Sequence, residues 1–82
     1  MTQKINRPLY EIANEIRKDW HNKIYFGAKP YLSAMQSLNS IDDIYGVESG
    51  KMIVLYFLSN ASTWRGETAK RIKNELKLIC KN

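Results

Sequence analysis

The sequence is poor in the residues that small proteins use to fix a fold or to bind a metal. It has one cysteine, one histidine and two prolines in 82 residues. The single cysteine, Cys80, excludes an internal disulfide and favours a reducing, intracellular setting. One His and one Cys cannot complete a zinc site of nitrogen and sulfur ligands, so we expect no structural metal. The longest apolar run, residues 52–58, is far shorter than the roughly 20 residues that cross a bilayer.

A catalytic constellation is also missing. The sequence places no serine or cysteine where His21 could act as its general base. Cys80 lies on an apolar stripe, where a thiol packs rather than reacts. Residues 46–52 resemble a phosphate-binding loop, but the glycine spacing differs and a methionine stands where a hydroxyl would hold magnesium. We therefore predict a non-enzymatic protein without a cofactor.

The composition indicates one globular domain over residues 1–82. The chain is 44% hydrophobic and 26% charged, which is ordinary for folded proteins, and a chain of this length supports a single thin core. Its first ten residues, MTQKINRPLY, lack the apolar run of a secretory signal. We expect a cytoplasmic protein that does not enter a membrane.

Hydrophobic periodicity predicts an all-α fold, a small bundle of about four helices. Apolar residues recur at helical spacing over 8–20, 29–38 and 63–80. The run 52–58 has the composition of a buried strand, but a lone strand would leave its backbone groups unpaired. We therefore predict a helix over 49–60, capped by Ser49 and apolar all round because it is the central helix. Residues 40–45 predict a short helical turn that ends at a left-handed Gly46.

Positive charge gathers in the C-terminal part of the chain. The protein has 13 Lys and Arg against 8 Asp and Glu, a net charge of +5. Four lysines of the helix predicted over 63–80 share a strip about 80° wide, which predicts a phosphate-tracking surface or, alternatively, a solvated face. Amide, hydroxyl and guanidinium groups near the start of that helix are suited to a phosphate or a base edge. The nucleic-acid-binding candidates are Asn60, Ser62, Thr63, Arg65, Lys70, Lys73, Lys77 and Lys81.

Two further features of this helix leave interpretations open. Beside the lysines, Glu67, Arg71 and Glu75 follow one another at i,i+4 and predict a short ion-pair ladder. Arg65 falls within the apolar arc of the helix. Either the helix starts near Gly66, with Arg65 turned outward or paired with Asp42, Asp43 or Glu48, or Trp64 and Arg65 form a partner-binding anchor. Trp and Arg are both enriched at interface hot spots.

The aromatic content is high for so small a core, with five Tyr, two Phe and two Trp. Some of these rings must reach the surface, because a domain this small has little interior to hold them. We expect Tyr25, Phe26 and Tyr31 to be partly exposed, as a partner contact or as the interface of a homodimer.

Three segments carry a family resemblance: EIANEIRKDW (11–20), YFGAKPYLSAM (25–35) and FLSNASTWRGETAKRIK (57–73). They resemble small proteins encoded by phages and prophages of Gram-positive bacteria, over roughly residues 10–79. The resemblance implies an intracellular accessory protein made during infection. Such a protein would bind and modulate a host or phage protein of nucleic-acid metabolism or defence, for example as a nuclease inhibitor or in an anti-CRISPR-like role. The alternative is direct, weakly sequence-specific DNA or RNA binding by the helix over 63–80.

Overall fold

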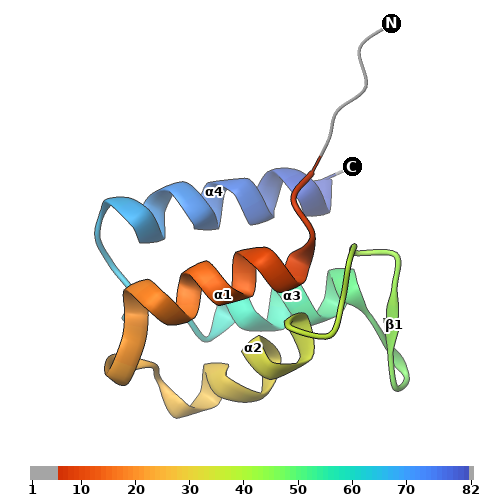
Figure 1. Ribbon diagram of the computed structural model, residues 1–82, viewed down its shortest axis with the longest axis horizontal. Helices are drawn as coiled ribbons and strands as arrows, with labels where there is room; N and C mark the ends of the chain where they lie inside the picture. Colours follow the sequence, from red (N-terminus) through yellow and green to blue (C-terminus); the bar gives the residue numbers. More distant parts are fainter. Residues whose placement is uncertain (1–5, 82) are drawn as a thin grey trace, which may run out of the picture.

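The computed structural model describes residues 6–81, and this part of the chain folds into four α-helices joined by short connections (Figure 1). The predicted small helical bundle is therefore confirmed. Two 3₁₀ helices and a two-stranded hairpin lie in the connections. In chain order the elements are α1 (Leu9–Trp20), η1 (His21–Lys23), η2 (Phe26–Ala28), α2 (Lys29–Met35), β1 (Ile44–Tyr45), β2 (Glu48–Ser49), α3 (Gly50–Ser59) and α4 (Glu67–Lys81).

The helices surround one hydrophobic core. α1 packs against α2 and α4, and α3 packs against the same two helices. In Figure 1, α3 lies behind α1, with α4 above this pair and α2 below it. α1 and α4 each present one apolar stripe to the core, whereas α3 is mostly apolar along its whole length. Because α1 and α3 lie on opposite sides of the core, the outer side of α3 has no helix over it.

The ends of the helices follow local sequence signals. Ser49 caps α3 as predicted, since its Oγ accepts a hydrogen bond from the backbone N–H of Met52 at 3.3 Å. The run 52–58 is helical, so its apolar composition reflects burial rather than a strand. α1 begins directly after Pro8. α2 is shorter than the predicted 29–38 and ends at Met35, although Leu38 beyond it is still buried.

The prediction of a helical turn over 40–45 is wrong. The Asp43 carboxylate accepts hydrogen bonds from the backbone N–H groups of Asn39 and Ser40, at 2.8 and 3.3 Å, and so fixes a tight turn. The chain then forms a hairpin, because Ile44–Tyr45 pairs in antiparallel fashion with Glu48–Ser49. Gly46 has the expected left-handed conformation, with φ +66°, but it opens the hairpin turn rather than ending a helix.

Two further expectations about the helices need correction. α4 starts at Glu67 instead of residue 63, because Gly66 has φ +114°, outside the helical region. α3 is not buried all round. Met52, Leu55 and Tyr56 are each 37% exposed. The bundle has no central helix, so α3 buries only the side that faces the core.

Candidate functional site

Trp64 is a core residue. Its side chain is 2% exposed, and its ring stacks on Trp20 of α1 with the centroids 5.6 Å apart. The rings of Trp64 and Phe57 of α3 pack edge to face, with their centroids 6.3 Å apart. The indole N–H donates to Asp19 Oδ2 at 2.9 Å, so its polar end is satisfied. The prediction that Trp64 is an exposed partner-binding anchor is therefore wrong, since the loop before α4 folds this ring into the core.

Arg65 follows the first of the two interpretations that the sequence left open. The helix starts beyond Gly66, and Arg65 is exposed. The ion pairs among residues 6–81 do not join it to Asp42, Asp43 or Glu48. Arg65 lines an open recess of about 540 Å³ together with Asp19, Trp20, Lys23, Thr63 and Trp64.

Arg65 and the lysines of α4 form one basic surface. Lys70, Lys77 and Lys81 are exposed and Lys73 is half-buried. Burial lowers the pKa of the Lys73 ammonium, and the positive charges of Lys77 and Arg65 lower it further. None of these side chains takes part in the ion pairs found within residues 6–81. We call this set the basic flank: Arg65, Lys70, Lys73, Lys77 and Lys81.

Lys73 also has a structural role. Its Nζ donates to the backbone carbonyl of Trp64 at 2.7 Å and lies 5.9 Å from the centroid of the Trp64 ring. It therefore ties α4 to the loop that carries Arg65. Because one donor is committed to this loop, Lys73 is a less accessible ligand for an anion than Lys77.

The opposite side of α4 is directed at α1. Arg7, just before α1, binds the Glu75 carboxylate with two nitrogens, at 2.9 and 2.8 Å, and Glu15 at 2.8 Å. Arg71 also binds Glu15. The predicted Glu67–Arg71–Glu75 ladder is thus replaced by ion pairs between α4 and the N-terminal segment of the fold. Since this side of α4 faces α1, the basic flank lies on the side toward α3.

The exposed side of α3 lies between α2 and α4. The Tyr56 ring contacts Tyr31 of α2, with the centroids 5.5 Å apart. On the other side, Lys51 is close enough to Cys80 of α4 to act electrostatically on its thiol, whose pKa is raised chiefly by burial. We call Met52, Leu55 and Tyr56 the α3 face. It is an apolar strip with the basic flank along one edge.

The aromatic residues of the segment before α2 are exposed as expected. Phe26 is 75% exposed and Tyr25 43%, and their ring centroids lie 4.9 Å apart. Tyr31 is half-buried and packs against the core. Their role as a partner contact or homodimer interface stays a prediction.

Asn60, Ser62 and Thr63 lie in the loop between α3 and α4 rather than on the first turn of α4. The Asn60 amide donates to the carbonyl of Tyr56 at 2.9 Å and so closes α3. Ser62 and Thr63 are exposed. The grouping of these side chains at a helix N-terminus, on which the base-reading prediction depended, does not occur, because α4 starts four residues later than expected.

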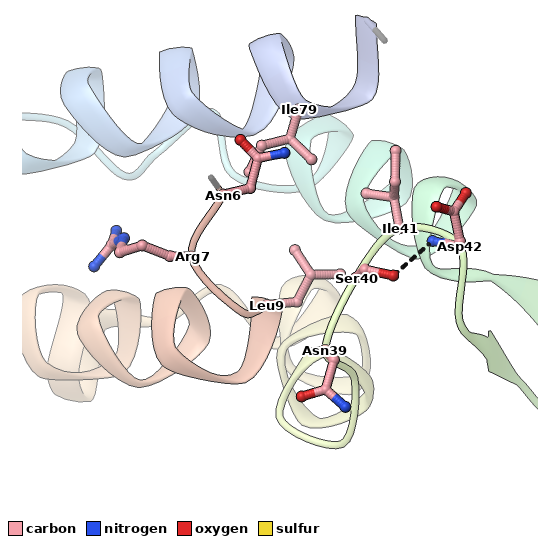
Figure 2. Close-up of a pocket in the computed structure, with 8 residues that line it drawn as sticks. All are labelled: Asn6, Arg7, Leu9, Asn39, Ser40, Ile41, Asp42 and Ile79. Carbon is pink, nitrogen blue, oxygen red and sulfur yellow. Dashed lines mark hydrogen bonds between the residues drawn. The ribbon is translucent and has the colours of Figure 1, made fainter. Parts of the chain in front are cut away.

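A cavity of about 230 Å³ lies between the start of α1, the turn before β1 and the end of α4. Figure 2 shows that its polar side chains do not converge: Arg7 and Asn39 point away from one another. Arg7 is held by its two glutamates, and the dashed bond joins Ser40 Oγ to the backbone N–H of Asp42 within the turn. The cavity therefore offers no focused binding site.

The α3 face and the hairpin are the surfaces that sequence reasoning missed. Val47 and Ile44 of the hairpin are 95% and 64% exposed. A signal for the α3 face was present, since an apolar helix in so small a bundle cannot bury every side.

Within residues 6–81 there is no cluster of three potential metal ligands and no helix with the length and apolar character needed to span a bilayer. Comparisons with protein-family models, curated proteins and solved structures found no match.

Proposed function

We propose that this is a non-enzymatic accessory protein that binds and modulates another protein through the α3 face and the basic flank. The partner presents an acidic surface. The setting we propose is cytoplasmic, in a bacterium that carries the phage or prophage, and the partner is a host or phage protein of nucleic-acid metabolism or defence. The segment resemblance described above supports this setting.

The observation that carries this proposal is that exposed apolar side chains lie on α3, which packs against α4, and that the lysines of α4 have no ion-pair partner among residues 6–81. A surface with cations alone would bind any polyanion. Met52 and Leu55 gain from burial only if the partner also brings apolar surface. A protein surface with an apolar centre and acidic residues at its edge satisfies both parts.

The second candidate is direct DNA or RNA binding by the basic flank. The mutual repulsion between Arg65, Lys73 and Lys77 favours it, because a phosphate backbone would relieve that repulsion and release counterions. Without aromatic residues between the lysines, such binding would be weakly sequence-specific.

Site-directed photo-cross-linking tests the first candidate. A photoreactive benzoylphenylalanine replaces Leu55 or Lys77 and, as the control, the exposed Lys18 of α1. The variants are expressed in the bacterial host during phage infection. We expect one partner protein to be captured from positions 55 and 77 but not from 18, and the Lys70→Glu/Lys81→Glu background to abolish capture. Equal capture from position 18, or none from 55 and 77, contradicts the proposal.

A salt series separates the second candidate from the first. Labelled single- and double-stranded DNA and RNA are titrated with the protein at low and near-physiological salt. Neutralising about four phosphates predicts a slope of log K against log salt of about −3.6. Such a slope, with binding lost in a Lys70→Glu/Lys77→Glu variant, would establish the nucleic-acid function. No binding at low salt removes it.

A further inference from the structure

The α3 face and the basic flank together have the chemistry and the length to bind one particular shape of partner. We propose that they bind an acidic amphipathic helix, about three turns long, that belongs to the partner protein. This inference rests on the proposed function and adds the conformation and charge pattern of the bound segment.

The apolar part of the surface follows a helical repeat. Met52, Leu55 and Tyr56 stand at i, i+3 and i+4, so they lie in one line along the outer side of α3. α3 has 10 residues and is therefore about 15 Å long. Its outer side is bordered by α2 and α4, because Tyr56 contacts Tyr31 and Lys51 is near Cys80. The strip itself, from Met52 to Tyr56, spans about 6 Å of this length, so a helix laid along α3 would cover the strip and extend past both of its ends.

The charges run parallel to the apolar strip. After the loop that contains Trp64, α4 returns along α3, so that Lys73 lies at the Trp64 end and Cys80 near Lys51. Lys77 is therefore level with the middle of α3. Lys73, Lys77 and Lys81 are spaced by four residues, which is about 6 Å along a helix. Acidic residues at every fourth position of a partner helix have the same spacing.

This charge complementarity favours a helix over other occupants. A nucleic acid would neutralise the lysines but leave Met52 and Leu55 uncovered. An anionic lipid surface needs apolar side chains that reach past the headgroups, whereas those of the α3 face are about one-third exposed between two helices. The cations border one edge of the strip, which fits a helix that is apolar on one face and acidic on one flank.

Synthetic peptides test the inference directly. The probe is a fluorescein-labelled, end-capped 14-residue peptide with leucines along one helical face and glutamates at every fourth position on one flank. One control peptide has lysine in place of each glutamate, and a second has the same composition in scrambled order. Binding is measured by fluorescence anisotropy at near-physiological salt, and amide shifts of the protein in NMR spectra locate the bound peptide.

We expect the acidic peptide to bind and to shift the amides of α3 and α4. Leu55→Ser and Lys77→Glu should each weaken binding about tenfold, as expected for residues at the centre of an interface. Lys77→Glu should also bind the lysine peptide more tightly than the wild-type protein does. The matched controls, Leu78→Ser on the other side of α4 and Lys18→Glu on α1, should change binding less than about twofold.

Several results would overturn the inference. Equal binding of the scrambled peptide would show that the protein does not recognise the helical arrangement of the peptide's side chains. An unchanged affinity in Leu55→Ser would show that the apolar strip is not part of the site. Leu55-dependent binding to duplex DNA or to phosphatidylglycerol vesicles would assign the surface to a different occupant. If the peptide fails while cross-linking from positions 55 and 77 still captures a protein, the helix is wrong and the proposed function stands. If both fail, the proposed function fails too.

Discussion

At the scale of single residues, Trp64 shows how much of the core depends on one side chain. Replacing it with alanine removes the contacts to Trp20 and Phe57 and leaves Asp19 without its donor. We expect Trp64→Ala to lower the free energy of unfolding by about 3–5 kcal/mol. Urea denaturation followed by far-UV circular dichroism measures this loss. Arg65→Ala, at the neighbouring exposed position, should stay within about 0.5 kcal/mol. Similar losses in both variants would contradict the assignment of Trp64 to the core.

Gly50 is a second residue on which the fold depends, because the backbone of the turn before β1 passes directly over it. A Cβ at this position would lie 2.5 Å from the carbonyl oxygen of Ser40 and 2.9 Å from the Cα of Ile41. Backbone cannot move aside as a flexible side chain does, so we expect Gly50→Ala to destabilise the protein by about 1–3 kcal/mol. The melting temperature measures the effect. Gly46→Asn is the control, since that site is open and asparagine tolerates its positive φ. A Gly50→Ala variant as stable as wild type would be incompatible with this contact.

At the scale of elements, Glu15 joins α1 to α4 and to the segment before α1. The pKa of the Glu15 carboxyl lies below its usual range. The largest cause is the hydrogen bond from Arg71, and the next largest is the hydrogen bond from Arg7. A carboxyl whose pKa is lower in the folded state stabilises the fold above its unfolded pKa, about 4.3. That stabilisation is lost as the pH falls through the folded value.

The corresponding variant is Glu15→Gln, which keeps the shape and loses the charge. At pH 7 it should be less stable than wild type by about 1 kcal/mol. This difference should shrink below about pH 4.3 and disappear once the wild-type carboxyl is protonated. Urea denaturation from pH 3 to pH 7 measures it, with Glu11→Gln on the exposed side of α1 as the control. A difference independent of pH would show that the charge of Glu15 does not act in this way.

The elements also show which parts of the structure the sequence could predict. Helices with a strong apolar stripe, such as α1, were predicted to within one residue, because burial of that stripe is the dominant local signal. The hairpin was missed because each of its strands has two residues, too few for a repeat to appear. The start of α4 was misplaced because Thr63 has the side chain of a good N-cap, whereas Gly66 at φ +114° delays the helix to Glu67. The basic flank was predicted, whereas the α3 face depended on the arrangement of helices in space.

At the scale of the whole molecule, the basic flank carries positive charge beyond that of Lys73, which is bonded to the Trp64 carbonyl. Lys77 has a like-charged neighbour one helical turn away on each side, Lys73 and Lys81, and such pairs cost a few tenths of a kcal/mol each. We expect Lys77→Glu to raise the free energy of unfolding by about 0.5–1 kcal/mol at low salt. In 1 M salt, where screening acts within about 3 Å, the gain should nearly vanish.

Urea denaturation at the two salt concentrations measures this gain, and Lys18→Glu, which lacks such neighbours, serves as the control. A residue whose removal stabilises the free protein is retained for something other than folding, so a gain specific to Lys77 would agree with a binding role for the basic flank. If Lys77→Glu instead lowers stability at both salt concentrations, the lysine contributes to the fold itself. A loss of binding in Lys77→Glu would then not be enough to place Lys77 in the interface. The Lys77→Gln variant, which removes the charge without reversing it, would have to lose binding as well.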